Sequence, residues 1–133
     1  QTEFAQMEVQ RGILPFGGAT VRFVQAAGWN KAMRYLLTGE RFNAQTAYDM
    51  NLVTEITDQA PLSRAIELAD SIAQAAPLAV QATLAAAQQG VHLGADAAFA
   101  QLNQHLQPLL KTQDVQEGVM AMLQRRAANF QGK

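Results

Sequence analysis

Glu8 is the side chain in this sequence that is best placed to transfer a proton. It is a lone carboxylate in a largely apolar run, residues 4–9 (FAQMEV), and the glycine-rich stretch 12–18 (GILPFGG) follows directly. Apolar surroundings raise the pKa of a carboxyl group, and a group that transfers protons near neutral pH needs such a raised pKa. Glycines let the backbone approach a ligand closely. The pattern fits acid–base chemistry on a bound substrate, and it equally fits a surface glutamate ahead of an ordinary loop.

The sequence lacks the residue patterns that other kinds of catalytic site require. Cysteine is absent, which removes thiolate catalysis and disulfides. The two histidines, His92 and His105, do not cluster with other ligand types, so we expect no metal. No serine stands in a Gly-x-Ser-x-Gly turn, and residues 12–18 lack the closing Lys-Ser/Thr of a phosphate loop.

The overall composition limits the class of protein. Hydrophobic residues make up 49% and charged residues 16% of the 133 residues, which is typical of a globular domain. The net charge is −1 and no basic run exceeds Arg125-Arg126, so we expect no nucleic-acid binding. The sequence shows no long apolar stretch and no signal-peptide pattern, so we expect neither a membrane span nor secretion, and a cytoplasmic location.

The elements that must position Glu8 and its loop fall in the first sixty residues. Residues 4–9 predict a short strand with Glu8 near its end, and residues 12–18 predict a loop. The elements expected next are a helix ending at Gly28, a helix ending at Gly39, a helix over 44–50 capped by Asn43, and a strand over 52–56.

From residue 61 onward the sequence predicts helices alone. Apolar residues recur three and four positions apart between 61 and 73, as on one buried helix face. The helices expected next are one over 77–89 that stops at Gly90, one over 95–111 with Pro108 inside it, and a last one begun by Asp114 and Glu117 as a capping pair.

Short motifs run along the whole chain in a fixed order. They are residues 4–9 (FAQMEV), 12–15 (GILP), 18–22 (GATVR), 37–47 (LTGERFNAQTA), 51–53 (NLV), 114–118 (DVQEG) and 124–126 (QRR). Their order and spacing resemble the enoyl-CoA hydratase/isomerase (crotonase) superfamily, from residue 4 to the C-terminus.

The resemblance implies a fold class that is mainly α with a short β remnant. The chain would be the C-terminal part of the crotonase β-β-α spiral plus a helical trimerisation layer. Residues 1–60 would end the spiral core, and residues 61–133 would form the oligomerisation region of a trimer or a dimer of trimers. Family members are longer, and the sequence opens at what the resemblance implies is the middle of the fold, so we expect a C-terminal fragment.

The resemblance also implies a reaction. Enoyl-CoA hydratase is the first expectation, with Glu8 as the acid/base at the α carbon, and Δ3-Δ2-enoyl-CoA isomerase is the second. In the family the other hydratase glutamate and both oxyanion donors come from upstream segments, so we expect the isolated fragment to be inactive. No cofactor is expected, because coenzyme A enters as part of the acyl-CoA substrate. The alternative of another class is a non-catalytic oligomerisation or interaction module.

The resemblance assigns further site residues around Glu8. It implies that Ile13, Leu14, Phe16 and Gly17 contact the substrate. Phe16 stands where the family commonly has glycine, and its bulk either walls the acyl pocket or belongs to the core. Arg125 stands where some members carry a basic residue that reaches the CoA of a neighbouring subunit. A solvated charge that complements a helix dipole is an equal explanation for Arg125.

Overall fold

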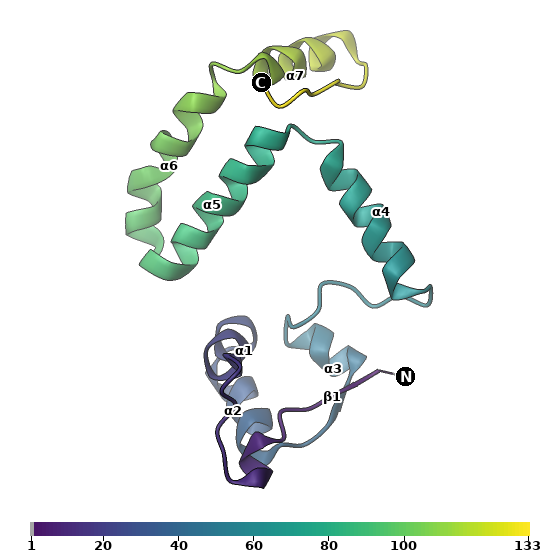
Figure 1. Cartoon of the computed structure of the whole chain (residues 1–133), viewed down its shortest axis with the longest axis vertical. Helices are drawn as coiled ribbons and strands as arrows, with labels where there is room; N and C mark the ends of the chain where they lie inside the picture. The colour runs from purple at the N-terminus through teal and green to yellow at the C-terminus, as the bar shows by residue number, and fades with distance from the viewer. Residues whose placement is uncertain (1) are drawn as a thin grey trace. The chain divides into compact units, whose positions relative to one another are not determined.

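Helices dominate the structure, a computed structural model that describes residues 2–133 (Figure 1). The chain divides between Gln59 and Ala60 into two compact units. The described residues form one small sheet of two strands, in the first unit. The prediction of a mainly helical chain with a short β segment is confirmed.

The first unit begins with a short strand and a single helical turn. Its elements are β1 (Glu3–Phe4), the 3₁₀ turn η1 (Glu8–Arg11), α1 (Ala19–Ala27), α2 (Trp29–Thr38), β2 (Phe42–Asn43) and α3 (Ala44–Asp49). The two strands pair antiparallel, with Glu3 opposite Asn43 and Phe4 opposite Phe42. This pairing joins the segment that leads to Glu8 to the segment that leads to α3.

Aromatic side chains hold the first unit together. Phe42 is 7% exposed, and its ring centroid lies 5.6 Å from that of Phe4, 4.7 Å from that of Tyr35 and 6.0 Å from that of Phe23. An isolated pair of two-residue strands is not stable in water, so this packing must fix the ladder. The core around these rings is completed by Ala32, Leu36, Ala47 and Met50.

Both strand predictions for this unit are wrong in position. The strand expected over 4–9 ends at Phe4, and Glu8 opens the 3₁₀ turn η1 instead. Residues 52–54 form bends and residues 55–56 have no regular structure, and the second strand is Phe42–Asn43. Leu52 and Val53 pack their side chains partly against the core without joining a ladder. Their apolar character therefore indicated burial rather than strand pairing.

The predicted helix ends at Gly28 and Gly39 and the predicted cap at Asn43 are confirmed. Gly28 and Gly39 end α1 and α2. The Asn43 side chain accepts a hydrogen bond of 2.9 Å from the backbone N–H of Thr46, so Asn43 caps α3 as expected. Such caps satisfy backbone groups that a helix leaves without partners, and they can be recognised from local sequence.

The second unit contains four helices: α4 (Pro61–Ala73), α5 (Pro77–Leu93), α6 (Ala95–Leu109) and α7 (Gln113–Gln124). Gly90 does not stop α5, which continues to Leu93. A Cβ atom added at Gly90 would lie 3.8 Å from the Ala98 side chain of α6, so a small residue suits the α5–α6 contact there. The expected capping pair is also wrong, because the Thr112 hydroxyl caps α7 by accepting 3.2 Å from the Val115 N–H.

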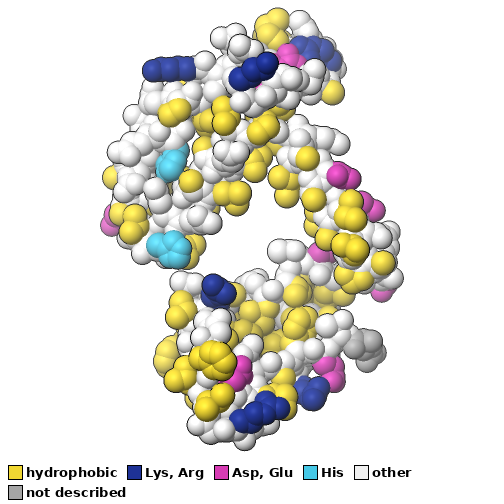
Figure 2. All heavy atoms as spheres, viewed as in Figure 1, with side chains coloured by type: hydrophobic (Ala, Val, Ile, Leu, Met, Phe, Trp, Pro, Cys, Tyr) yellow, Lys and Arg dark blue, Asp and Glu magenta, His cyan; other side chains and the backbone are white. Residues whose placement is uncertain are grey.

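The apolar face of α4 is not covered by the described residues. Leu62, Ile66 and Ile72 share this face and are 72%, 51% and 58% exposed. Figure 2 shows hydrophobic side chains along this helix. Uncovered apolar surface of this kind is typical of an interaction site.

Candidate active site

Glu8 lies on a tight single turn rather than on a strand. It is the first residue of η1, and Gly12 ends the turn with a left-handed backbone (φ 77°) that favours glycine. The Ile13 N–H donates to the Glu8 carbonyl over 3.2 Å, and the Gly12 N–H donates to the Val9 carbonyl over 3.3 Å. The turn therefore leads directly into the glycine-rich loop.

The Glu8 carboxylate has one oxygen with an unusual environment. Oε2 is shielded from solvent and has no hydrogen-bond partner among residues 2–133. Leaving a buried polar atom without a partner costs roughly 1–3 kcal/mol, and more for a charged group. No other side-chain N or O atom in that part of the chain combines burial with the lack of a partner. A buried, unpartnered acceptor of this kind is what a group reserved for a substrate or a bound water presents.

The loop after Glu8 exposes its apolar side chains. Ile13, Leu14 and Phe16 are 52%, 64% and 81% exposed, and Gly17 is also exposed. Phe16 therefore lies outside the core that residues 2–133 form. The first unit thus carries Glu8 and the four loop residues expected to contact substrate within one continuous segment.

Arg125 lies in the second unit, at the C-terminal end of α7. It has a left-handed backbone (φ 54°), its side chain is exposed, and its N–H donates 3.2 Å to the Met122 carbonyl. Both explanations of its charge are consistent with that place, since it stands at a helix C-terminus and it is accessible to a ligand.

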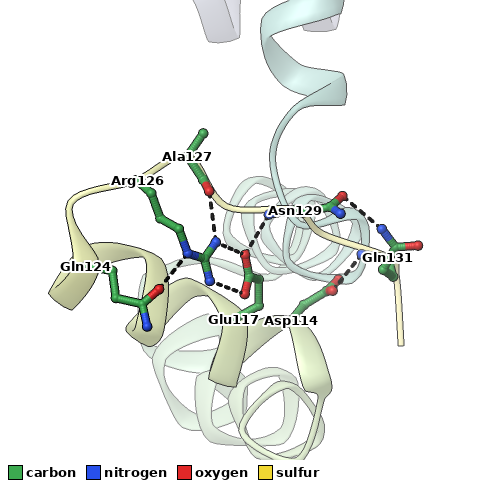
Figure 3. Close-up of polar contacts among 7 residues, drawn as sticks. All are labelled: Asp114, Glu117, Gln124, Arg126, Ala127, Asn129 and Gln131. Atoms are coloured by element: carbon green, nitrogen blue, oxygen red, sulfur yellow. Dashed lines mark hydrogen bonds and ion pairs between the residues drawn. The ribbon is translucent and has the colours of Figure 1, made fainter.

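The next residue, Arg126, forms an intramolecular ion pair that the sequence did not reveal. Its guanidinium meets the Glu117 carboxylate with two bonds of 2.5 and 2.8 Å (Figure 3). The Asn129 N–H donates a further bond of 2.8 Å to the same carboxylate. Hydrogen bonding to Arg126, with the Asn129 N–H adding to it, lowers the pKa of Glu117 to about 2.

A second carboxylate of α7 also holds the C-terminal segment. Asp114 is 4% exposed and accepts bonds of 2.7 Å from the Gln131 N–H and 2.8 Å from the Gly132 N–H. The Gln113 N–H, at the start of α7, donates 2.8 Å to the Lys133 carbonyl. Residues 126–133 therefore fold back along α7. We call residues 126–133 the C-terminal tail.

Acid should release the tail from α7. The folded pKa of Glu117 is about 2 and an unfolded glutamate titrates at about 4.3, so this stabilisation is complete above pH ~4.3 and is lost as the pH falls toward 2. We expect the amide NMR signal of Asn129 in the folded protein to titrate with a midpoint near the pKa of Glu117, about 2. Glu117→Gln should give a loosened tail at every pH. Glu67→Gln, which breaks the Arg64–Glu67 pair on α4, serves as the control. A Glu117 carboxyl that titrates near pH 4.3 in the folded protein would contradict the prediction.

Two further kinds of site were searched for in the described part of the chain. No three side chains of His, Asp or Glu gather there as a metal-ligand set. None of the helices between residues 2 and 133 combines the length and the apolar character that crossing a bilayer requires.

Comparison with known proteins matches the whole chain to one family. A family model described as enoyl-CoA hydratase/isomerase matches residues 1–133. The chain is 34% identical to the 2,3-dehydroadipyl-CoA hydratase of Escherichia coli K12 over 131 residues, which cover 98% of this chain and 51% of that protein. It is 33% identical to an enoyl-CoA hydratase of Mycobacterium tuberculosis, with 98% and 50% covered. The chain thus spans about half the length of these relatives.

Solved structures agree with the sequence matches. The chain superposes on a probable enoyl-CoA hydratase/isomerase from Mycobacterium abscessus with a TM-score of 0.93 and 45% identity, covering 98% of this chain and 51% of that one. An enoyl-CoA hydratase from Bacillus anthracis gives a TM-score of 0.94 at 26% identity, with 100% and 52% covered. The crotonase fold predicted from the motifs is therefore confirmed. The chain belongs to the enoyl-CoA hydratase/isomerase family, a family of enzymes that act on acyl-CoA substrates.

Proposed function

We propose that the protein is an enoyl-CoA hydratase, which adds water to the double bond of a 2-enoyl-CoA, and that Glu8 is the acid/base at the α carbon. The observation that carries this proposal is the Glu8 Oε2 atom, which is shielded from solvent and has no partner within residues 2–133. A carboxyl group that moves a proton to or from carbon must keep one oxygen available to the substrate. The exposed apolar loop that follows Glu8 supplies surface for an acyl group.

The chemistry needs more than Glu8. When a proton is added to or taken from the α carbon, the thioester oxygen becomes enolate-like, and N–H donors must stabilise it. In the family those donors and the second hydratase glutamate belong to segments upstream of the motifs found here. We therefore propose that residues 1–133 by themselves do not turn over enoyl-CoA.

Isomerisation of a Δ3-enoyl-CoA to the Δ2 form is the second candidate. One acid/base that removes a proton from one carbon and returns it to another is sufficient for this reaction. Glu8 is a single group with one oxygen free of partners in the described chain, so it suits isomerisation as well as hydration. The presence of a second glutamate in the complete active site would favour hydration.

The other parts of the proposal follow the same resemblance. Ile13, Leu14, Phe16 and Gly17 would contact the substrate, and Arg125 would contact the CoA phosphates. Coenzyme A would enter with the substrate, with no other cofactor and no metal, and the location would be cytoplasmic. Residues 1–60 would end the catalytic core.

The second unit would serve oligomerisation. The exposed apolar face of α4, formed by Leu62, Ile66 and Ile72, supports residues 61–133 as the interface of a trimer or a dimer of trimers. The same face supports the alternative of another class, a non-catalytic interaction module built from this part of the fold.

The first test is the intact mass, under denaturing conditions, of the polypeptide that the source cell makes, followed by assays on that polypeptide. We expect a mass well above the 14.4 kDa of this sequence, together with hydration of a short-chain 2-enoyl-CoA, measured by loss of the enoyl thioester absorbance. Isomerisation of a 3-enoyl-CoA without hydration would replace the hydratase proposal with the isomerase. A mass of 14.4 kDa and no reaction in either assay would favour the interaction module.

A further inference from the structure

We infer that Gln10 is a positioning residue for Glu8, because its side-chain amide binds the η1 turn to the C-terminal end of α2. We call this contact between Gln10 and Thr38 the clamp. The Gln10 Nε2 atom donates a hydrogen bond of 2.8 Å to the Thr38 carbonyl. The two residues are far apart in sequence, and the contact joins the Glu8 motif to the Leu-Thr-Gly motif at residues 37–39. The inference rests on the proposed role of Glu8.

The turn that carries Glu8 is weak by itself. It has four residues, and Met7, which precedes it, makes no side-chain cap. Its backbone bonds are 3.1 Å from the Gln10 N–H to the Met7 carbonyl and 3.2 Å from the Ile13 N–H to the Glu8 carbonyl. Isolated 3₁₀ turns have poor hydrogen-bond geometry, so an outside contact must fix the position of this one.

The end of α2 is a firm anchor. The Thr38 carbonyl belongs to the last turn of a helix and has no helical partner of its own, so it is available to an outside donor. The Thr38 hydroxyl donates 2.7 Å to the Arg34 carbonyl and accepts 3.2 Å from the Glu40 N–H, which fixes the residue. The buried side chains of Tyr35 and Leu36 hold this end of α2 in the core.

Gly39 provides the surface on which the Gln10 amide lies. A Cβ atom at Gly39 would lie 2.8 Å from Nε2 and 2.9 Å from Cδ of Gln10, closer than atoms pack. Gly39 is buried and has a left-handed backbone (φ 68°). Glycine therefore suits this position for two reasons: it favours the left-handed helix end, and it lets the Gln10 side chain lie where a Cβ atom would force that side chain to move.

The clamp controls where the Glu8 carboxylate lies. Glu8 and Gln10 are two positions apart on a turn with three residues per turn, so their side chains leave the turn in different directions. Gln10 reaches α2, and the Glu8 Oε2 atom is shielded from solvent. Holding Gln10 prevents the turn from rotating about its axis, and a displacement of about 1 Å at a reacting group can cost on the order of 10²-fold in rate.

The test is Gln10→Ala in the polypeptide as the source cell makes it. We expect kcat to fall about tenfold with little change in KM, because the acid/base is displaced while substrate contacts remain. The amides of Gly12 and Ile13 should exchange hydrogen faster, since the turn loosens. Gln10→Lys keeps a donor for the Thr38 carbonyl and should restore most of kcat.

Gln45→Ala is the matched control, because the Gln45 amide also makes one exposed hydrogen bond of this length, 2.9 Å to Asp49, in the same unit. It should leave kcat unchanged. Gly39→Ala should displace the Gln10 side chain, so adding it to Gln10→Ala should lower kcat by less than the two single effects combined.

Two results would overturn the clamp. They are unchanged exchange of Gly12 and Ile13 in Gln10→Ala, and a kcat equal to that of the unaltered protein. If Glu8→Gln retains full activity, the proposed function fails instead, and the hydrogen exchange of Gln10→Ala still decides whether the clamp exists.

Discussion

In the polypeptide as the source cell makes it, replacing Glu8 with glutamine should lower turnover of enoyl-CoA by about 10²- to 10⁴-fold, the usual contribution of a general acid or base. The amide keeps the size of the carboxylate and cannot exchange a proton with the α carbon at useful rates. We expect kcat to fall while KM changes little, because an acid/base, the role proposed for Glu8, acts in the transition state rather than in binding.

Glu8→Gln should not lower the Tm of the protein, although it lowers turnover. The Glu8 Oε2 atom is buried without a partner in the described chain, so the free energy of unfolding is already reduced by the desolvation of that oxygen. Glutamine in place of this half-buried glutamate removes the charge and breaks no side-chain hydrogen bond of Oε2. We therefore expect the Tm of Glu8→Gln to be equal to or higher than that of the unaltered protein, a pattern that a structural glutamate would not give.

Glu3→Gln is the matched control for Glu8→Gln. Glu3 lies in the same unit, is 58% exposed and pairs with Arg41 at 3.3 Å, so its carboxylate has a partner and contacts solvent. We expect its substitution to leave both turnover and Tm nearly unchanged. Equal turnover in Glu8→Gln and Glu3→Gln would remove Glu8 from the mechanism.

The parts of the fold that could be predicted depend on local signals. Gly28 and Gly39 end helices, and Asn43 caps α3, because each acts on backbone groups within a few residues of itself. The helix over 61–73 follows from the spacing of its apolar residues. The sequence could not show that this face is left uncovered, because exposure depends on what packs against it.

The parts that could not be predicted depend on contacts between distant residues. The strand at Phe42–Asn43 exists because Phe42 packs against Phe4, and two residues carry no recognisable period. The Glu117–Arg126 pair crosses the end of a helix, where the spacing rules for helical ion pairs no longer apply. The Gln10–Thr38 bond belongs to the same class, since nothing near Gln10 in the sequence indicates its partner.

The candidate site also has features that the sequence indicates and features that only the structure shows. The type of Glu8 and the motifs around it made it the candidate, and the structure adds an observation that no motif could give: one carboxylate oxygen is shielded from solvent and has no partner in residues 2–133. For Phe16 the sequence left pocket and core equally open, because a phenylalanine suits both. Phe16 is 81% exposed in this unit, so the wall of an acyl pocket stays a proposal, and packing against a further part of the assembled protein stays its alternative.

Phe42 is buried and Phe16 is exposed, so their replacement should affect the stability of the first unit very differently. Phe42→Ala should destabilise the first unit by about 3–5 kcal/mol, the usual cost of removing a buried aromatic ring. Phe42 contacts the rings of Phe4 and Tyr35, so its loss should also release the β1–β2 ladder and loosen the segment that leads to Glu8. The measurement is urea unfolding followed by the fluorescence of Trp29, the single tryptophan of the chain, which lies in α2 of the same unit.

Phe16→Ala is the control that isolates burial from residue type. The side chain removed is identical, but Phe16 is 81% exposed where Phe42 is 7% exposed. An exposed side chain far from any cap or ion pair changes stability by less than about 0.5 kcal/mol when it is replaced. Equal destabilisation by the two variants would mean that Phe16 is packed in the assembled protein. The loop after Glu8 would then be covered by a neighbouring segment or subunit rather than open to substrate.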